Sequence, residues 1–418
     1  MPIRKINDFE ILKIKSLSER YGTPFYMYNG ATINERVEGL KKSFPSFKFY
    51  FSMKSNPNKS IASYIRSLGV HAEVSSGGEL FNSIEAGFSN SNTIFLGPAK
   101  SEDEIIYALE SDIFAFIAES RLDIERIDFL AGKRQKKIKI ILRINPTTTY
   151  KDAKEKMAGE PTQFGFDQET VLDDLKNIKM HHSEIIGIHT YRASQVLDED
   201  FIISTIQETI DIAFHLSKSL TFNLRFIDFG GGFGVPYNDN ESELDIQYIA
   251  SKVEPLVQEL KKQEVSLVFE LGRYLVAESG FYVTSVRNIK NSRGKNFIIT
   301  DGGMNHFFRP IFMDLNHPTI LLRKKDQIRN KNSTIYNAVG PTCTPMDCIA
   351  KEIVFELAEC GDLMVFQNAG AYGLSMSLLN FLSHPWPLEI LLIAQKEFII
   401  RKRGNFQNIF GEEIIQKF

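Results

Sequence analysis

The stretch YFSMKSNP, residues 50–57, places Lys54 directly after an apolar run with the composition of a buried strand, and Asn-Pro then breaks the chain. An ammonium group is costly to bury unless it is paired or has lost its charge. Lys54 is therefore either an amine that does chemistry at this position or a surface lysine whose stem alone is buried.

Glycine and polar residues follow three further apolar runs. His189 lies near the end of IIGIHTY, Gly230–Gly232 end RFIDFGGG, and Glu270 and Arg273 lie at the end of SLVFELGR. The exposed backbone N–H groups of a glycine turn can approach phosphate oxygens closely. The alternatives are a tight strand-to-helix turn for the glycines and a core histidine for His189.

Alternating strands and helices would bring these residues together. Short β-rich runs recur eight times, and amphipathic stretches such as KSIASYIRSLG lie between them. The runs cover residues 47–54, 71–76, 92–97, 113–120, 139–146, 185–191, 225–232 and 266–273. Such alternation predicts parallel strands with right-handed crossovers, and eight units can close into a barrel.

A doubly wound sheet is the alternative α/β architecture. The barrel is favoured because polar residues follow many different runs, and a (β/α)8 barrel builds its site at the C-terminal ends of its strands. We therefore predict a TIM-like barrel over residues 30–278. Residues 1–29 plus 279–418 are predicted to form a β-rich domain, and the early run at 24–30 is expected to pair within it.

Composition excludes several classes of protein. The chain has 418 residues, with 49 basic and 52 acidic side chains and no long run of one sign, so nucleic acid is not an expected partner. No apolar segment approaches the roughly 20 residues of a membrane helix, and the N-terminus does not read as a signal peptide. The three cysteines form neither a disulfide framework nor a zinc spacing. We expect a cytoplasmic protein without a metal site.

The lysine and the glycine turns together suggest a cofactor. A phosphate site facing a buried lysine suits a phosphorylated aldehyde, and pyridoxal 5′-phosphate fits. Lys54 would bind the aldehyde covalently, and an acidic side chain would keep the pyridine nitrogen protonated so that the ring can take up electrons.

Eight motifs then point to a family, and they occur in its order between about residues 20 and 395. They are YFSMKSN, VSSGGEL, LRINP, DFGGGFG, FELGR, DGGMNHFFRP, GPTCTPMD and NAGAYG. Together they resemble the fold type III pyridoxal-phosphate decarboxylases, the group of diaminopimelate, ornithine and arginine decarboxylases. The resemblance implies a barrel plus a β-domain, and a head-to-tail homodimer in which each active site borrows residues from the partner subunit.

The resemblance also implies roles for individual residues. Lys54 corresponds to the cofactor lysine, Glu270 to the partner of the pyridine nitrogen, and His189 to a residue against the ring face. The residues implied to hold phosphate are Gly231, Gly232, Gly272 and Arg273, with Tyr372 nearby. Glu270 also separates the decarboxylases from racemase relatives, which place an arginine against the nitrogen.

Further residues are implied for the substrate and for proton transfer. Cys343, followed by Asp347 as the pattern requires, would come from the partner subunit and protonate the carbanion after CO₂ leaves. An inert thiol is the alternative for Cys343. Arg309, Asp347 and Tyr372 are expected to contact the substrate.

The sequence departs from the diaminopimelate enzymes at three distal positions. Thr344 stands where they usually have glutamate, Met313 where they have tyrosine, and Gln163 where they have lysine or a similar residue. Loss of such polar partners should cost on the order of 10⁴ in discrimination. The patterns MAGxPTQFG, GPxCTPxD and FLSHPxPxEI resemble instead a subgroup from siderophore and aminoglycoside pathways. Its enzymes act on an amino acid conjugated to citrate or to an acyl carrier protein.

Arg192, in HTYRASQ, stands where the family usually has a small residue. We hypothesise that it contacts carboxylates of a citrate-like conjugate, together with Arg309. The alternative is an exposed charge on the rim of the barrel.

Three functions remain as hypotheses from the sequence. The first is a decarboxylase of a conjugated amino acid, with an acyl carrier protein as a further partner. The second is a decarboxylase of diaminopimelate or another free basic amino acid. The third is a non-catalytic, antizyme-like cofactor-binding protein. Lys54, Glu270 and Cys343 together favour turnover.

Overall fold

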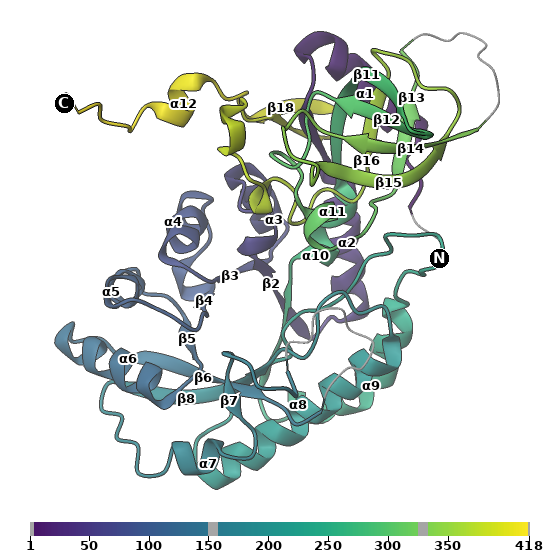
Figure 1. Cartoon of the computed structure of the whole chain (residues 1–418). Helices are drawn as coiled ribbons and strands as arrows, with labels where there is room; N and C mark the ends of the chain where they lie inside the picture. The colour runs from purple at the N-terminus through teal and green to yellow at the C-terminus, as the bar shows by residue number, and fades with distance from the viewer. Residues whose placement is uncertain (1–3, 149–157, 325–332, 417–418) are drawn as a thin grey trace. The chain divides into compact units, whose positions relative to one another are not determined.

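The computed structural model describes residues 4–148, 158–324 and 333–416, and the chain divides into two compact units (Figure 1). The first unit consists of Asn34–Val235 and Ser242–Leu275, and the second of Pro2–Ile33, Pro236–Glu241 and Val276–Phe418. The short segment Pro236–Glu241 belongs to the second unit, although it lies inside the range predicted for the barrel.

Eight parallel strands form a closed barrel in the first unit, and each overlaps one of the eight predicted runs. The strands are β2 (Phe47–Ser52), β3 (His71–Val74), β4 (Thr93–Phe95), β5 (Ala115–Ala118), β6 (Ile138–Asn145), β8 (Ser183–Thr190), β9 (Phe226–Asp228) and β10 (Ser266–Leu271). The barrel closes because β10 pairs with β2 and β5 pairs with β6. The prediction of a barrel is confirmed, and the doubly wound sheet is excluded.

Helices cover the outside of the barrel (Figure 1). Several begin at a side chain that accepts a hydrogen bond from a first-turn N–H, as Ser76, Ser120 and Asp198 do. The helices are α2 (Gly30–Ser43), α3 (Lys59–Ser67), α4 (Gly77–Glu85), α5 (Glu102–Glu110), α6 (Arg121–Lys133), α7 (Val171–Asp174), α8 (Glu199–Leu220) and α9 (Ile246–Lys261), and the short helix α10 (Arg273–Val276) follows β10. The two-residue strand β7 (Phe166–Asp167) pairs with β6.

Aromatic packing joins the strands that carry the candidate site. The Phe269 ring on β10 stacks on Phe47 of β2, with centroids 4.8 Å apart. It also lies 5.6 Å from the Phe229 ring and 5.2 Å from the Phe233 ring, on either side of the glycine turn after β9. Burial of such large rings fixes the beginning of β2, the end of β10 and the turn after β9 against one another.

The second unit is built on a nine-stranded mixed sheet. Its strands are β1 (Phe25–Asn29), β11 (Gly280–Ser292), β12 (Lys295–Thr300), β13 (Thr319–Leu322), β14 (Thr334–Val339), β15 (Cys348–Phe355), β16 (Leu363–Phe366), β17 (Leu388–Ile393) and β18 (Lys396–Arg401). Strand β1 lies between β11 and β17, antiparallel to the first and parallel to the second. The expected pairing of this early run within the β-rich domain is confirmed.

Helix α1 (Asp8–Tyr21) was not predicted from the sequence. It begins with a capping box formed by Asn7 and Glu10, and it buries Ile14 and Leu17 in the core of the second unit. This unit also holds the short helices α11 (Arg309–Phe312) and α12 (Phe406–Phe410). Within the described ranges, no helix has the length and apolarity needed to cross a membrane.

Candidate active site

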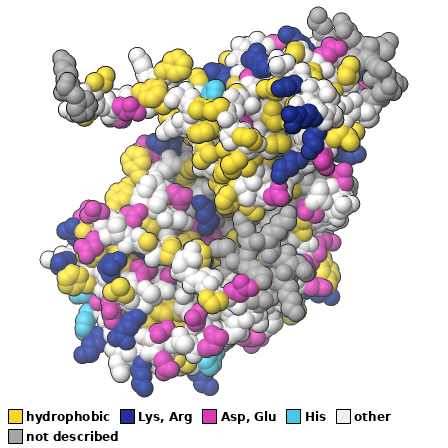
Figure 2. Space-filling view, in the orientation of Figure 1, with side chains coloured by type: hydrophobic (Ala, Val, Ile, Leu, Met, Phe, Trp, Pro, Cys, Tyr) yellow, Lys and Arg dark blue, Asp and Glu magenta, His cyan; other side chains and the backbone are white. Residues whose placement is uncertain are grey.

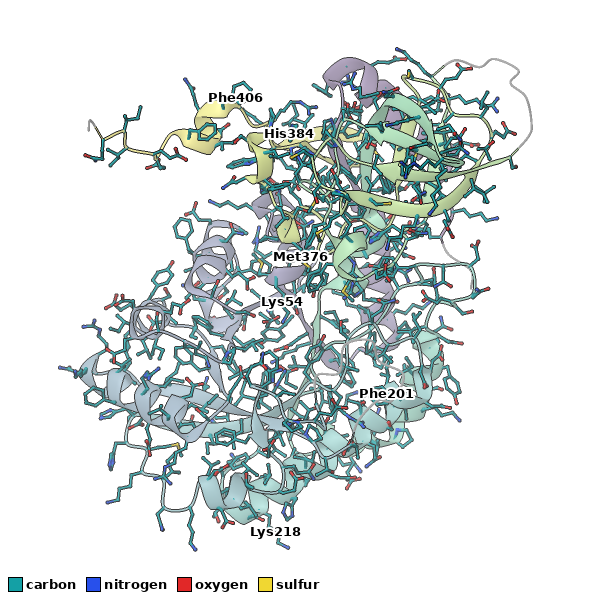
Figure 3. The ribbon with its side chains drawn as sticks, in the orientation of Figure 1. Lys54, Phe201, Lys218, Met376, His384 and Phe406 are labelled. Atoms are coloured by element: carbon teal, nitrogen blue, oxygen red, sulfur yellow. The ribbon has the colours of Figure 1, made fainter. Side chains whose placement is uncertain are left out.

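Lys54 lies in a single 3₁₀ turn, Met53–Ser55, that directly follows β2 (Figure 3). The Ser55 hydroxyl donates to the Ser52 carbonyl and so braces the turn. The Lys54 side chain is 39% exposed, and its Nζ lies 3.4 Å from Oε2 of the fully buried Glu73 on β3. The expectation of a buried lysine is wrong, because the Lys54 side chain is partly open to solvent while its amine pairs with the Glu73 carboxylate.

Glu270, on β10, is a buried carboxylate whose two oxygens differ. Oε2 lies 3.3 Å from His189 Nε2, and Oε1 is buried without a hydrogen-bond partner among the described residues. Burial alone would raise the pKa of Glu270, but the attraction of His189 and Lys54 outweighs it and lowers the pKa. The site therefore holds a negative charge with an unused acceptor, as a protonated ring nitrogen requires.

His189, near the end of β8, lies beside Glu270. Its side chain has no accessible surface and lies against Glu270. The implied position of His189 against the face of the bound ring stays a prediction.

Tyr191, two residues after His189, was missed by the sequence reasoning. It is half-buried, and its ring atoms are among the nearest neighbours of Gly230, Gly231 and Gly232. Tyr191 is thus an aromatic side chain beside the glycine turn. The period of two along a strand was the available signal, because it puts residues 189 and 191 on the same face.

The turn after β9 requires glycine because its backbone conformation and its close packing leave no room for a side chain. Gly230 and Gly232 have positive φ angles of 63° and 95°. A Cβ on Gly231 would lie 2.0 Å from the Glu270 carbonyl oxygen, and one on Gly272 would lie 2.8 Å from Ser55 Cβ. The turn, the end of β10 and the turn that carries Lys54 therefore pack closely.

Arg273 follows Gly272 and begins α10. Its Nη2 donates to the Ser194 hydroxyl at 3.2 Å. The predicted phosphate residues of the first unit thus come from two neighbouring strand ends, and Ser194 joins them from the segment after β8.

The packing at Gly231 gives a testable consequence. We expect Gly231→Ala to weaken binding of pyridoxal 5′-phosphate about 10- to 100-fold, because the new Cβ must displace the backbone at Glu270. Absorbance titration of the cofactor into the unloaded protein measures this. Gly39→Ala on α2 is the matched control, since its Cβ meets nothing within 4 Å. Unchanged affinity of the Gly231 variant would remove the turn from the cofactor site.

Two further acidic residues of the barrel were missed. Asp228, at the end of β9, is fully buried beside Glu270 and His189. Glu79, on α4, accepts a hydrogen bond from the Ser75 N–H. Burial, with a contribution from Glu73, raises the pKa of Glu79 to about 7. Their positions within DFGGG and SSGGEL were the available signal.

Arg192 is buried rather than exposed on the rim. Nη1 lies 2.9 Å from Oε2 of Glu208 on α8 and donates to the Thr205 hydroxyl, while Nη2 donates to Thr148. The guanidinium also lies 4.6 Å from the centroid of the Phe201 ring, which Figure 3 labels. These contacts hold Arg192 against α8 and exclude the exposed rim charge, while the contact with a substrate carboxylate stays a prediction.

The second unit carries the remaining predicted residues. Arg309 is fully buried, and its guanidinium lies 5.2 Å from the Tyr237 ring centroid and 5.8 Å from that of Tyr372. Tyr237 comes from the segment Pro236–Glu241, which is why this segment belongs to the second unit. The chain thus builds an aromatic enclosure around Arg309.

Asp347 braces the loop that carries Cys343. Its Oδ1 accepts from the Met304 N–H at 2.7 Å, and its Oδ2 accepts from the N–H and the hydroxyl of Thr342. Both oxygens are therefore engaged within the unit, which favours a positioning role, and the expected contact with substrate stays a prediction. Cys343 itself is exposed.

The fold and this arrangement define a class of protein. A family model described as the pyridoxal binding domain of pyridoxal-dependent decarboxylases matches residues 30–277. The chain belongs to the pyridoxal-dependent decarboxylase family, and it is an enzyme of that class that uses pyridoxal phosphate.

Particular relatives include decarboxylases of conjugated and free amino acids. The chain is 36% identical to an L-glutamyl-[BtrI acyl-carrier protein] decarboxylase from Niallia circulans. The similarity extends over 413 residues, which are 96% of this chain and 96% of the relative. It is 32% identical to a 2-[(L-alanin-3-ylcarbamoyl)methyl]-2-hydroxybutanedioate decarboxylase from Staphylococcus aureus, over 89% of this chain and 94% of the relative. The diaminopimelate decarboxylase of Helicobacter pylori complexed with L-lysine superposes with a TM-score of 0.87 at 30% identity, over 95% of this chain and 98% of that one.

The residues present fit pyridoxal phosphate. The unpartnered Oε1 of Glu270 suits the ring nitrogen, the glycine turn suits the phosphate, and Lys54 supplies an accessible amine. The prediction of the cofactor and of a decarboxylase is confirmed, and a non-catalytic relative is not favoured.

Proposed function

We propose that this enzyme removes the α-carboxylate of an amino acid conjugated to citrate or to an acyl carrier protein. The observation that carries this is the neutral residue at 344. The Thr344 hydroxyl accepts from the Met346 N–H within its own loop, so this position offers no charge to a distal ammonium group. Met313, at the end of α11, is apolar as well. The similarity to the carrier-protein and citrate-derived decarboxylases supports the same substrate class.

We also propose how the residues of the barrel divide the work. When bound, pyridoxal phosphate would supply a sink for the electron pair that CO₂ leaves on Cα, provided that its ring nitrogen were protonated. Lys54 holds the cofactor covalently, and Glu270 keeps a proton on the nitrogen. Gly231, Gly232, Gly272 and Arg273 hold the phosphate. His189 donates to Glu270 and orients it.

The second unit would supply the proton and contact the substrate. We propose that Arg309 and Tyr372 contact the substrate, and that Cys343 of the partner subunit protonates Cα. Support comes from the exposed apolar side chains on this unit, which Figure 2 shows gathered on its visible face and which suit a homodimer contact. They include Phe312, Met346, Leu378, Phe381 and Leu382.

A substrate panel tests the proposed specificity. We expect a glutamyl-carrier protein or citryl-diaminopropionate to give a kcat/KM about 10³- to 10⁴-fold above that of diaminopimelate or ornithine, because the distal site lacks the charged partner that a free ammonium needs. Released CO₂ is the measurement. Preference for diaminopimelate would overturn the proposal in favour of a free amino acid decarboxylase.

Mixed dimers test the shared site. Lys54→Ala and Cys343→Ala are each expected to be nearly inactive alone, whereas mixing and reassociating the two should restore roughly a quarter of wild-type activity. About half of the dimers are then mixed, and one of the two sites in each is intact. Absence of recovery, with dimer exchange verified by differently tagged chains, would place Cys343 outside the partner's site.

A further inference from the structure

Three strand ends of the barrel bring together one histidine and two carboxylates. Asp228 on β9 pairs in register with His189 on β8, and Glu270 lies on β10, the other neighbour of β9. One ligand atom from each of these three residues lies within 4.8 Å of the others. Asp228 and His189 have no accessible surface, and Glu270 is 6% exposed.

The hydrogen bonds of this cluster leave two acceptors unsatisfied. Asp228 Oδ1 accepts from the Gly230 N–H at 2.9 Å, but Oδ2 is buried without a partner in the described parts of the chain. Glu270 Oε1 is also buried without a hydrogen-bond partner among the described residues. Two buried carboxylates this close cannot both remain ionised without a large penalty. One proton placed between them gives both oxygens a partner.

The surroundings decide which carboxylate carries that proton. His189 and Lys54 favour the anion of Glu270, whereas among the described residues Asp228 accepts a hydrogen bond from the Gly230 N–H alone. Burial first, and then the Glu270 charge, raise the pKa of Asp228 well above its ordinary value. The titratable groups that face Asp228 are His189 on β8, Glu270 on β10, Glu73 on β3 and Tyr50 on β2.

We propose that Asp228 is a neutral carboxylic acid that donates its proton as a hydrogen bond to Glu270, and so is a positioning residue for the group that faces the cofactor nitrogen. This inference rests on the proposed role of Glu270. A carboxylate oxygen has two lone pairs, so Glu270 can accept from Asp228 and from the ring nitrogen together. The Gly230 contact also ties the proton donor to the glycine turn.

Stability of the cofactor-free protein tests the protonation state without any turnover. An acid whose pKa is raised on folding stabilises the fold at low pH and loses that contribution as the pH rises. Asp228→Asn has no proton to lose, while its amide can donate to Glu270 and its carbonyl can accept from Gly230. We therefore expect the melting temperature of the asparagine variant, relative to wild type, to increase steadily from pH 5 to pH 8. Because Glu79 titrates in both proteins, its effect cancels.

Activity measurements show whether Asp228 acts as a hydrogen-bond donor or as a negative charge. Asp228→Ala is expected to lower kcat about 10- to 100-fold, because a hydrogen bond to a charged group is lost, while borohydride still traps cofactor on Lys54. Asp228→Asn is expected to recover most of that loss. Asp211→Asn, on the exposed face of α8, is the matched control.

Two outcomes would overturn the inference. If Asp228 is ionised, the melting temperature of Asp228→Asn relative to wild type stays constant between pH 5 and pH 8, and the variant matches the alanine variant in kcat. If instead a divalent cation bridges Asp228, Glu270 and His189, stoichiometric metal remains with the purified protein and chelation changes its melting temperature. Because the stability measurement needs neither substrate nor cofactor, it stands even if the proposed substrate class is wrong.

Discussion

Replacing Lys54 with alanine is expected to lower kcat by at least about 10³-fold and to abolish borohydride-trapped cofactor on the protein. Lys54 is the accessible amine that the turn after β2 sets beside Glu73, and alanine leaves no amine at that position. Mass spectrometry of the reduced protein and measurement of CO₂ release check the two parts separately.

A neighbouring lysine provides the control for this result. Lys59, on α3, is 52% exposed and pairs with Glu85 on the surface. Lys59→Ala should keep cofactor labelling and retain kcat within about twofold. If Lys54→Ala retained labelling and turnover, the cofactor lysine would lie elsewhere and the assignment of the whole barrel site would fail.

Replacing Glu270 with glutamine is expected to lower kcat about 10²- to 10³-fold while the cofactor stays bound through Lys54. The amide keeps the size of the side chain but loses the negative charge that His189 and Lys54 favour. A neutral partner no longer holds a proton on the ring nitrogen, so the ring takes up electrons less well. Single-turnover CO₂ release measures the chemical step.

Glu254→Gln, on the exposed side of α9, controls for removal of a carboxylate. It should leave kcat unchanged. The cofactor absorbance of the Glu270 variant should also shift with the protonation of the ring. A kcat within threefold of wild type would show that another group protonates the nitrogen, whatever the substrate proves to be.

The barrel could be predicted from the sequence because its signals are local. Apolar runs with polar ends recur at strand spacing, and the residue types at those ends identified Lys54, Glu270 and the glycine turn. The early strand could also be placed with the second unit, because it precedes the first barrel unit. These features depend on neighbours in the chain or on the period of a strand.

What could not be predicted depends on contacts across strands and helices. The burial of Arg192 follows from Glu208 and Thr205, which α8 brings to it. The burial of His189 follows from its register with Asp228, a residue of another strand. Asp347 looked like a functional acid in its motif, yet its oxygens are satisfied by backbone groups of its own unit. The hydrogen-bond and ion-pair partners of these side chains cannot be predicted from the spacing or the composition of the sequence.

The position of β1 has a consequence for how the chain is made. Phe25 faces Val283 on one side and Leu388 on the other, so a strand synthesised before the barrel completes its pairing only after β11 and β17 have emerged. Contacts of such long sequence separation form late. The strands of the first unit can pair during translation, while both edges of β1 stay unpaired. A fragment that ends after the barrel would expose this apolar strand, and an exposed, unpaired strand promotes aggregation.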